Sequence, residues 1–213
     1  MMPFDFYSIG HSNIPAERFV ALLRAAAVSA IADVRSTPVS RFCPWFSAKN
    51  LSPFLAGEGM AYLPSGKALG GRPRDQDLYC DGIADYEAMA RRPDFAAAMD
   101  GLLADAERCR AKTRATGRLC LMCAEREPLD CHRCLLVARA LAARGMTIGH
   151  ILHDGTIEPH AATEQRLLQL DGDGGDLFVT GNLFATRLGE RLAAAYRRRA
   201  RAVAYRKSEN HSR

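Results

Sequence analysis

Hydrophobic residues follow two patterns along the chain: short continuous runs, and longer stretches in which they recur every three or four positions. The short runs predict buried β-strands, and the longer stretches predict helices with one buried face. Strands are predicted over residues 4–9, 30–34, 60–63, 119–123 and 147–152. Helices are predicted from Pro15 to Ala26 and over residues 51–55, 83–91, 94–112, 131–144, 160–170 and 186–205.

Residue types near the helix ends support these assignments. Asn13 is a typical N-cap residue and Pro15 suits an early helical position. Phe19, Leu22 and Leu23 then share one face of the helix that follows. This segment therefore has both the start signal and the buried stripe of an amphipathic helix.

Strands separated by helices are typical of βαβ units, whose parallel sheet is covered on both faces. The chain is therefore predicted to be a three-layer α/β domain with a mainly parallel sheet of about five strands. We expect a single domain over residues 1–185, and a basic C-terminal helix and tail over residues 186–213 that pack on this domain or extend from it. A Gly- and Arg-containing loop predicted over residues 64–82 is too long for a simple connection, which is typical of functional or mobile loops.

Composition restricts the class of protein further. With 213 residues, 48% hydrophobic and 25% charged, the chain has the composition of an ordinary globular domain, not of a collagen-like or disordered protein. No apolar stretch reaches the roughly 18 residues of a membrane span, and the first seven residues lack the pattern of a secretion signal. We therefore expect a cytoplasmic protein with no membrane partner. The seven cysteines, an odd number, favour reduced thiols over a complete disulfide framework.

The net charge of +5 is unevenly distributed. Residues 187–213 contain nine Lys or Arg and two acidic residues, whereas residues 1–186 contain 20 basic and 22 acidic residues. In the predicted last helix, Arg191, Arg197, Arg198 and Arg201 lie opposite an apolar stripe. Such a basic face is usually only solvated, and its alternative role is salt-sensitive contact with nucleic-acid phosphates.

Residue types common in catalysis follow four of the predicted strands. They are His11, Ser12 and Asn13 after the first strand, Arg35, Ser36 and Arg41 after the second, Glu125, Cys131, His132 and Arg133 after the fourth, and His153 and Asp154 after the fifth. Because ligands of open α/β sheets bind beyond the carboxyl ends of the strands, these loops are predicted to form one crevice.

Five motifs carry a resemblance to a known family. They read YSIGHSN, ADVRSTPVSRF, LGGRP, LCLMCAEREPLDCHR and HILHDG in this order. Over roughly residues 6–165 the chain resembles the bacterial family filed as domain of unknown function 488, which implies a compact α/β domain of about this size and no established activity. The positions that match the motifs are His11, Ser12, Asp33, Arg35, Pro38, Ser40, Arg41, Gly70, Gly71, Arg72, Cys123, Glu125, Cys131, His132, Arg133 and Asp154. Cys120, Cys134 and the basic tail lie outside the pattern.

The cysteines allow several interpretations. Two CxxC pairs, Cys120 with Cys123 and Cys131 with Cys134, have the spacing of a four-thiolate zinc site, but residues three apart in a strand point to opposite faces. This zinc site stays an open alternative, and no metal is expected. Asp130 is predicted to cap a helix whose first turn holds Cys131, His132 and Arg133, where backbone N–H groups favour a thiolate or a bound anion. Both Cys123 and Cys131 could equally be buried packing residues.

The arginines and histidines complete the predicted site. Five residues are predicted to bind an anionic substrate: Ser12, Arg35, Arg41, Arg72 and Arg133. Gly70 and Gly71 can bring backbone N–H groups close to it. Five further residues are predicted to be catalytic, with Cys123 or Cys131 as the reactive thiol and the others as proton-transfer groups: Cys123, Cys131, His11, Glu125 and His132. Pairing of single arginines with nearby carboxylates is the competing interpretation.

These observations lead to a functional hypothesis. We expect an enzyme, a thiol-dependent hydrolase or transferase, that acts on a small anionic substrate of the phosphate, nucleotide or nucleobase type. The alternative is a nucleic-acid-binding module that uses the Arg-rich rim and the C-terminal helix, and a third interpretation is a purely structural interaction domain. The sequence names no cofactor and leaves the oligomeric state open.

Overall fold

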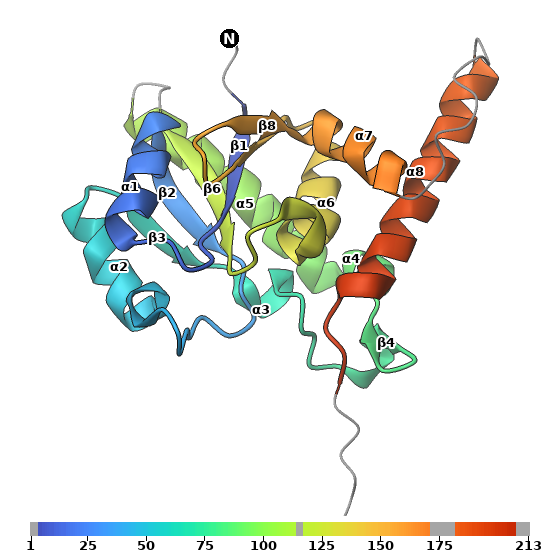
Figure 1. Cartoon of the computed structure of the whole chain (residues 1–213), viewed down its shortest axis with the longest axis horizontal. Helices are drawn as coiled ribbons and strands as arrows, with labels where there is room; N and C mark the ends of the chain where they lie inside the picture. Colours follow the sequence, from blue (N-terminus) through green and yellow to red (C-terminus); the bar gives the residue numbers. More distant parts are fainter. Residues whose placement is uncertain (1–3, 114–116, 171–181, 208–213) are drawn as a thin grey trace, which may run out of the picture.

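The computed structural model describes residues 4–113, 117–170 and 182–207, and its centre is a six-stranded sheet in the order β3-β2-β6-β1-β7-β8 (Figure 1). Five strands run parallel, and they correspond to the five predicted ones: β1 (Phe6–Gly10), β2 (Val28–Asp33), β3 (Ala61–Pro64), β6 (Arg118–Cys123) and β7 (Ile148–Ile151). A short sixth strand, β8 (Ile157–Pro159), pairs antiparallel with β7 at one edge. The predicted α/β class with a mainly parallel sheet is confirmed.

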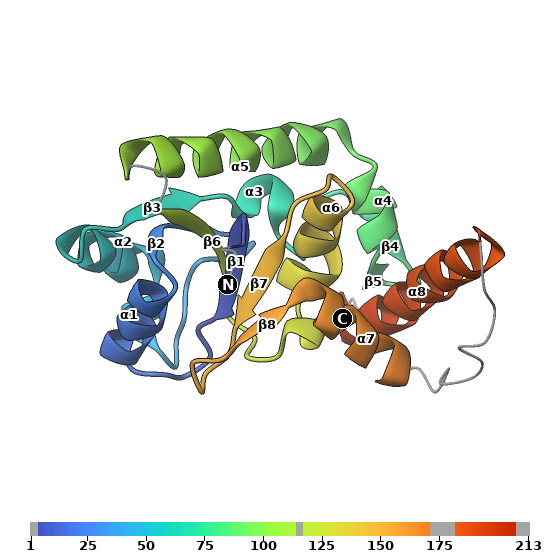
Figure 2. The same cartoon turned by 90° about the horizontal axis from the view of Figure 1, so that it is seen from above.

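Helices cover both faces of the sheet (Figure 2). One face packs on α1 (Ala16–Ala25) and α2 (Ala48–Gly57), and the other on α5 (Pro93–Lys112) and α6 (Arg139–Ala142). Strand β6 shows how the sequence divides between the two layers, because successive side chains point to opposite faces. Its Leu119, Leu121 and Cys123 join the layer of α5, whereas Cys120 and Met122 join the layer of α1 and α2. Both layers are apolar, which explains why the central strands read as continuous hydrophobic runs.

Three details differ from the sequence expectations. The N-cap of α1 is Pro15 rather than Asn13, and no side chain caps this helix. The predicted loop over residues 64–82 contains the short helix α3 (Gly66–Leu69) and the first strand of a hairpin, β4 (Tyr79–Cys80). The predicted helix over residues 83–91 is in fact β5 (Ile83–Ala84) followed by α4 (Tyr86–Ala90). Here the Asp85 carboxylate accepts hydrogen bonds from two backbone N–H groups and so starts α4 later than the hydrophobic pattern indicates.

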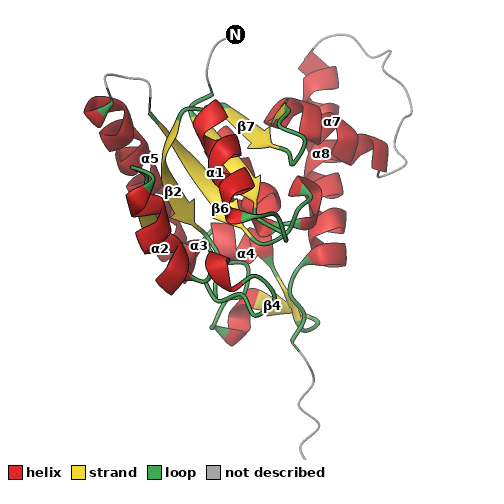
Figure 3. Ribbon diagram, turned by 60° about the vertical axis from the view of Figure 1, so that its left-hand side comes forward, coloured by secondary structure: helices red, strands yellow, loops and turns green. Residues whose placement is uncertain are grey.

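The C-terminal segment packs on the domain. Helices α7 (His160–Leu170) and α8 (Asn182–Val203) lie side by side at the β8 end of the sheet (Figure 3). Tyr196 of α8 is buried, and beyond the helix the Tyr205 carbonyl accepts a 3.0 Å hydrogen bond from the Ala84 N–H group. Within the described ranges, no helix is both long and apolar enough to cross a membrane.

Gly10 ends β1 in close contact with the loop that follows β6. A Cβ atom at this position would lie 1.7 Å from the Glu125 carbonyl oxygen, so Gly10→Ala must displace backbone. We expect this change to lower the free energy of unfolding by about 3 kcal/mol or more, as measured by urea denaturation. Gly101, in the middle of α5 with open space around it, is the matched control, and Gly101→Ala should stabilise the protein by about 0.5–1 kcal/mol. Equal stability of the two variants would contradict this account of β1.

Candidate functional site

A pocket of about 540 Å³ opens where the carboxyl ends of β1, β2 and β6 meet. Its walls come from the loop after β2, from the segment at Gly71, from α4 and from the end of α8. Eight of the ten predicted site residues line it: His11, Arg35, Arg41, Arg72, Cys123, Glu125, Cys131 and His132. The crevice predicted at the strand ends is therefore present, and it draws on three of the four predicted strand-end loops.

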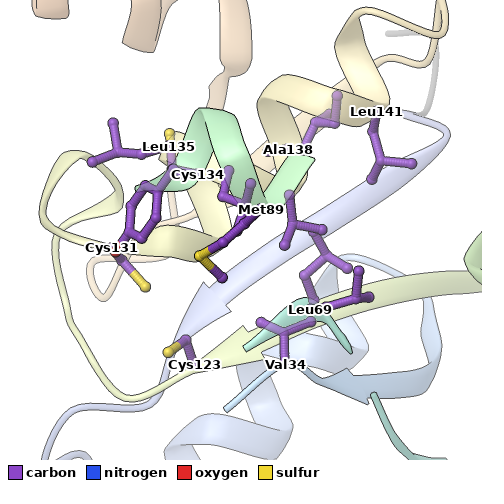
Figure 4. Close-up of a cluster of buried hydrophobic side chains, with 14 of the residues drawn as sticks. Val34, Leu69, Met89, Cys123, Cys131, Cys134, Leu135, Ala138 and Leu141 are labelled. Atoms are coloured by element: carbon purple, nitrogen blue, oxygen red, sulfur yellow. The ribbon is translucent and has the colours of Figure 1, made fainter. Parts of the chain in front are cut away.

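Two thiols, a carboxylate and an imidazole meet at the floor of the pocket. Cys123 ends β6, and Cys131 directly follows the short 3-10 turn η3 (Pro128–Asp130), so the two cysteines lie on either side of the segment that joins them (Figure 4). The Glu125 Oε2 atom lies 2.8 Å from Cys123 Sγ and 3.0 Å from Cys131 Sγ. The Nδ1 atom of His132 lies 3.8 Å and 3.9 Å from the same two sulfur atoms. We call these four residues the floor cluster.

Cys131 itself occupies the N-cap position that the sequence assigned to Asp130. Cys131 has extended backbone angles, and its carbonyl oxygen accepts the first helical hydrogen bonds from the N–H groups of Cys134 and Leu135. The helix therefore begins at His132 and continues through the π-helical segment η4 (Arg133–Ala138) into α6. The backbone N–H group of Arg133 points to Cys131 Sγ at 3.4 Å, as in a side-chain cap. Asp130 instead pairs with Arg199.

The His132 ring is held in one orientation. Its Nε2 atom lies 2.8 Å from the Val34 carbonyl oxygen, which can only accept a hydrogen bond, so Nε2 carries the proton and Nδ1 faces the sulfur atoms. Gly71 packs directly against this ring, and a Cβ there would lie 2.8 Å from His132 Cγ. Gly70 approaches Ser36 still more closely, since a Cβ there would lie 2.2 Å from Ser36 Oγ, and its N–H group donates to the Gly66 carbonyl rather than to a ligand.

The two thiols of the floor cluster differ in acidity. Burial raises the pKa of the Cys123 thiol, and the charges of Cys131 and Glu125 raise it further. Burial also opposes ionisation of Cys131, but a hydrogen bond from Cys123 and the positive charges of Arg133 and His132 outweigh it and hold the Cys131 pKa well below its usual value. Burial lowers the pKa of His132, but the nearby Cys131 charge more than compensates and leaves it raised. The cluster thus favours negative charge on at least one sulfur atom.

Arg35 forms an ion pair with Asp33, which agrees with the alternative that an arginine of this site binds a nearby carboxylate instead of a substrate. Its Nε and Nη2 atoms donate to Asp33 at 2.8 Å and 2.6 Å, and Tyr62 donates to the same carboxylate at 2.6 Å. The remaining Nη1 group donates to His11 Nε2 at 3.1 Å. Burial and the charge of Arg35 lower the pKa of His11 to about 4, so His11 is neutral near pH 7 and its Nε2 atom is already engaged. Proton transfer by His11 is therefore not supported by its surroundings.

Two predicted anion ligands lie outside the pocket. Arg133 has 1% of its surface exposed, and its Nη1 and Nη2 groups donate to the carbonyl oxygens of Glu125 and Arg126 at 2.6 Å and 2.9 Å. Its direct role in anion binding is corrected to holding the loop after β6 and placing a charge beneath Cys131. The Ser12 hydroxyl is directed to Asn13 at 3.4 Å and does not contact the pocket.

Arg41 and Arg72 are the exposed cations of the pocket. Neither forms an ion pair with any residue in the described part of the chain, although the Arg72 guanidinium lies 4.7 Å above the Tyr205 ring. Beside them, Phe42 is 92% exposed. The rim therefore combines free positive charge with apolar surface.

Several lining residues were missed by sequence reasoning. Tyr86, Val203 and Tyr205 reach the pocket from α4 and from the end of α8. The hydrophobic pattern gives Tyr86 and Val203 ordinary helix-face positions, and no motif singles out Tyr205. Conversely, the loop after β7 stays outside the pocket, where His153 Nε2 bonds to the Gly10 carbonyl oxygen at 2.7 Å.

The four-thiolate zinc site is excluded by the sheet geometry. Because β6 is continuous, Cys120 lies on the opposite face from Cys123. Cys134 lies in a separate cluster, 3.9 Å from His150 Nε2. The strand-spacing argument against this site is therefore correct.

That separate cluster is a chain of hydrogen bonds through the interior. Ser8 Oγ is 2.6 Å from His150 Nδ1, and His150 Nε2 is 2.9 Å from His160 Nδ1. His160 Nε2 is 3.1 Å from the Tyr196 hydroxyl, which donates to Glu164 at 2.9 Å. Each group in the chain thus has a partner, which accounts for the burial of two imidazoles.

Comparisons with known proteins give one match. A family model described as domain of unknown function DUF488 matches residues 15–140, a range that contains the floor cluster, Arg35, Arg41 and Arg72. No curated protein and no solved structure matches the chain.

The buried imidazoles make stability depend on pH. Burial lowers the pKa of His160 to about 4, against about 6.5 in the unfolded chain. Between these values the unfolded state binds a proton that the native state does not, so the free energy of unfolding should fall as the pH decreases from 6.5 to 4, by about 3 kcal/mol for this group. Denaturant titrations at several pH values should show a shallower decline for His160→Gln. Parallel declines for the two proteins would contradict the assignment.

Proposed function

The chain belongs to the DUF488 family, and from its pocket we propose that it is an enzyme, a hydrolase or transferase, that acts on a small anionic substrate of the phosphate, nucleotide or nucleobase type. The observation that carries the proposal is the placement of Arg41 and Arg72 at the mouth of a pocket whose floor holds two thiols, a carboxylate and an imidazole. A cavity with a few convergent reactive groups is the usual form of an active site.

The arginines divide into two groups according to burial. Arg35 and Arg133 are buried and already bound to Asp33 or to backbone carbonyls, so they shape the site. Arg41 and Arg72 are exposed, and their guanidinium groups are available for the bidentate hydrogen bonds that phosphate and carboxylate accept. In this proposal the anionic group of the substrate therefore binds to Arg41 and Arg72.

The apolar part of the rim supports a substrate with a flat ring. Phe42 exposes most of its side chain, and Val39 and Tyr205 lie on the same pocket. Aromatic side chains bind nucleobases by stacking, at about 1–3 kcal/mol per base. A nucleotide, which joins a base to a phosphate, would use both kinds of surface.

The floor cluster supplies the reacting groups in this proposal. Glu125 is exposed to the pocket and touches both sulfur atoms, so it is the proton carrier that a substrate can reach. The orientation of His132 directs its Nδ1 atom to the same two sulfur atoms.

A cytoplasmic location is part of the proposal. All seven cysteines are free thiols, and two of them belong to the floor cluster. Free thiols persist in a reducing compartment, which supports the expectation from the sequence.

The nucleic-acid-binding alternative stays a hypothesis with weaker support. On α8, Arg197 lies 3.5 Å from Glu87, and Arg201 pairs with Asp81. These carboxylates offset part of the basic face on which the alternative depends. An electrostatic nucleic-acid site would show a steep decrease of oligonucleotide affinity with salt, whereas we expect only weak binding at low salt.

Calorimetric titration with inorganic phosphate and with nucleoside 5′-monophosphates tests the anion site. We expect Arg41→Ala and Arg72→Ala each to weaken binding about tenfold, because each removes a charge-assisted hydrogen bond. Arg108, which pairs with Asp105 on the outer surface of α5, provides the control Arg108→Ala, and this variant should bind as the wild type does.

Turnover of the same ligands should fall in parallel with binding in the two rim variants. If both rim variants bind and turn over these ligands as well as Arg108→Ala does, the pocket is not an anion site and the proposal fails.

A further inference from the structure

We propose that Cys123, Glu125, Cys131 and His132 bind a zinc ion at the floor of the pocket. The four potential ligand atoms, two Sγ, one Nδ1 and one Oε2, all lie within 4.8 Å of one another. The inference shares its pocket with the proposed function and deepens it by naming the group that would act on the substrate.

The distances suit a tetrahedral ion after a small adjustment. Zinc bonds of about 2.3 Å to sulfur and about 2.0 Å to nitrogen place these atoms about 3.5 Å apart at a tetrahedral angle. The observed separations of His132 Nδ1 from the two sulfur atoms are 3.8 Å and 3.9 Å. Glu125 Oε2 is closer to the sulfur atoms than a ligand oxygen would be, and its exposed side chain is free to move outward.

The surroundings of the ligands are those of a metal site. A metal-binding histidine usually donates its other N–H group to a carbonyl or carboxylate, and His132 does so to the Val34 carbonyl at 2.8 Å. The Arg133 N–H group lies 3.4 Å from Cys131 Sγ. Gly71 has no side chain and so leaves room for the His132 ring in this orientation. The fold therefore orients three of the four ligands: His132 by Val34, Cys131 by the Arg133 N–H group, and Cys123 by its place at the end of β6.

The types of donor atom favour zinc among the common divalent cations. Sulfur and imidazole ligands select zinc rather than magnesium or calcium, which prefer oxygen.

The position of the ion would connect it to the substrate. Cys123, Cys131 and His132 are almost fully buried, whereas Glu125 faces the pocket. Glu125 is therefore the ligand that water or a substrate oxygen could displace, which would leave the three protein ligands that are typical of catalytic zinc. The anion held at Arg41 and Arg72 would lie on that open side.

Zinc titration of the full-length chain under reducing conditions, with a chelator competitor and elemental analysis, tests the site. We expect one zinc per chain, and cobalt in its place should give the absorption of thiolate-to-metal charge transfer. Cys123→Ser and Cys131→Ser should each lower zinc affinity by more than about 100-fold, since loss of an outer partner alone costs about 10- to 100-fold. Cys134→Ser and Cys80→Ser are matched controls that should retain wild-type affinity, because both thiols lie outside the floor cluster.

Glu125→Gln keeps the fold-forming residues intact and should lower zinc affinity at least tenfold. Absence of zinc binding by the wild type, unchanged affinity in Glu125→Gln, or loss of zinc in Cys134→Ser but not in Cys123→Ser would each overturn the inference. The last result would place the ion at the His150 and His160 cluster instead. Zinc binding without phosphate binding would refute the proposed function alone, and phosphate binding without zinc binding would refute this inference alone.

Discussion

The hydrogen bonds from the buried Arg133 side chain to two backbone carbonyls hold the site together. Arg133 in η4 donates to the carbonyl oxygens of Glu125 and Arg126, and these bonds hold the loop after β6 against the helical segment that follows it. The same loop continues the pairing of β1 with β6, because the N–H groups of His11 and Ser12 donate to the carbonyls of Cys123 and Ala124. Carbonyl oxygens of an irregular loop need hydrogen-bond donors, and the Nη1 and Nη2 groups of the buried guanidinium supply them, although its Nε group has no partner among the described residues. Each therefore stabilises the other, and the result is that Cys123 and Cys131 face one pocket.

This arrangement explains which parts of the site the sequence could predict. Residues such as His11, Arg41 and Cys131 follow parallel strands, and the topology of a parallel sheet brings all such residues to one edge. The hydrophobic runs of β1, β2 and β6 are sufficient for that inference, since buried parallel strands need apolar residues on both faces. Tyr205 could not be found in this way, because it reaches the pocket only through the packing of α8 on the domain.

The role of each arginine was equally beyond the sequence. Arg35 and Arg41 occur six residues apart in one motif and look alike as anion ligands, yet Asp33 engages the first and leaves the second exposed. Arg133 differs from both because helix geometry turns its side chain inward, toward carbonyls that only the folded loop provides. Burial, which depends on tertiary packing, decides whether a guanidinium binds the protein or a ligand. Cys131 is a similar case: because the helix starts one residue later than expected, Cys131 is its N-cap residue and not part of its first turn.

The electrostatics of the pocket connect the anion site to the metal site. Without a metal ion, the Glu125 carboxylate at the floor would repel the phosphate that Arg41 and Arg72 attract. A zinc ion bound to the floor cluster would replace this repulsion with attraction. The bound ion would then attract the substrate oxygen nearest to it and stabilise the negative charge that develops there during reaction. Rim arginines and a floor of two thiols and a carboxylate are therefore compatible in one active site if a divalent cation binds to the floor cluster.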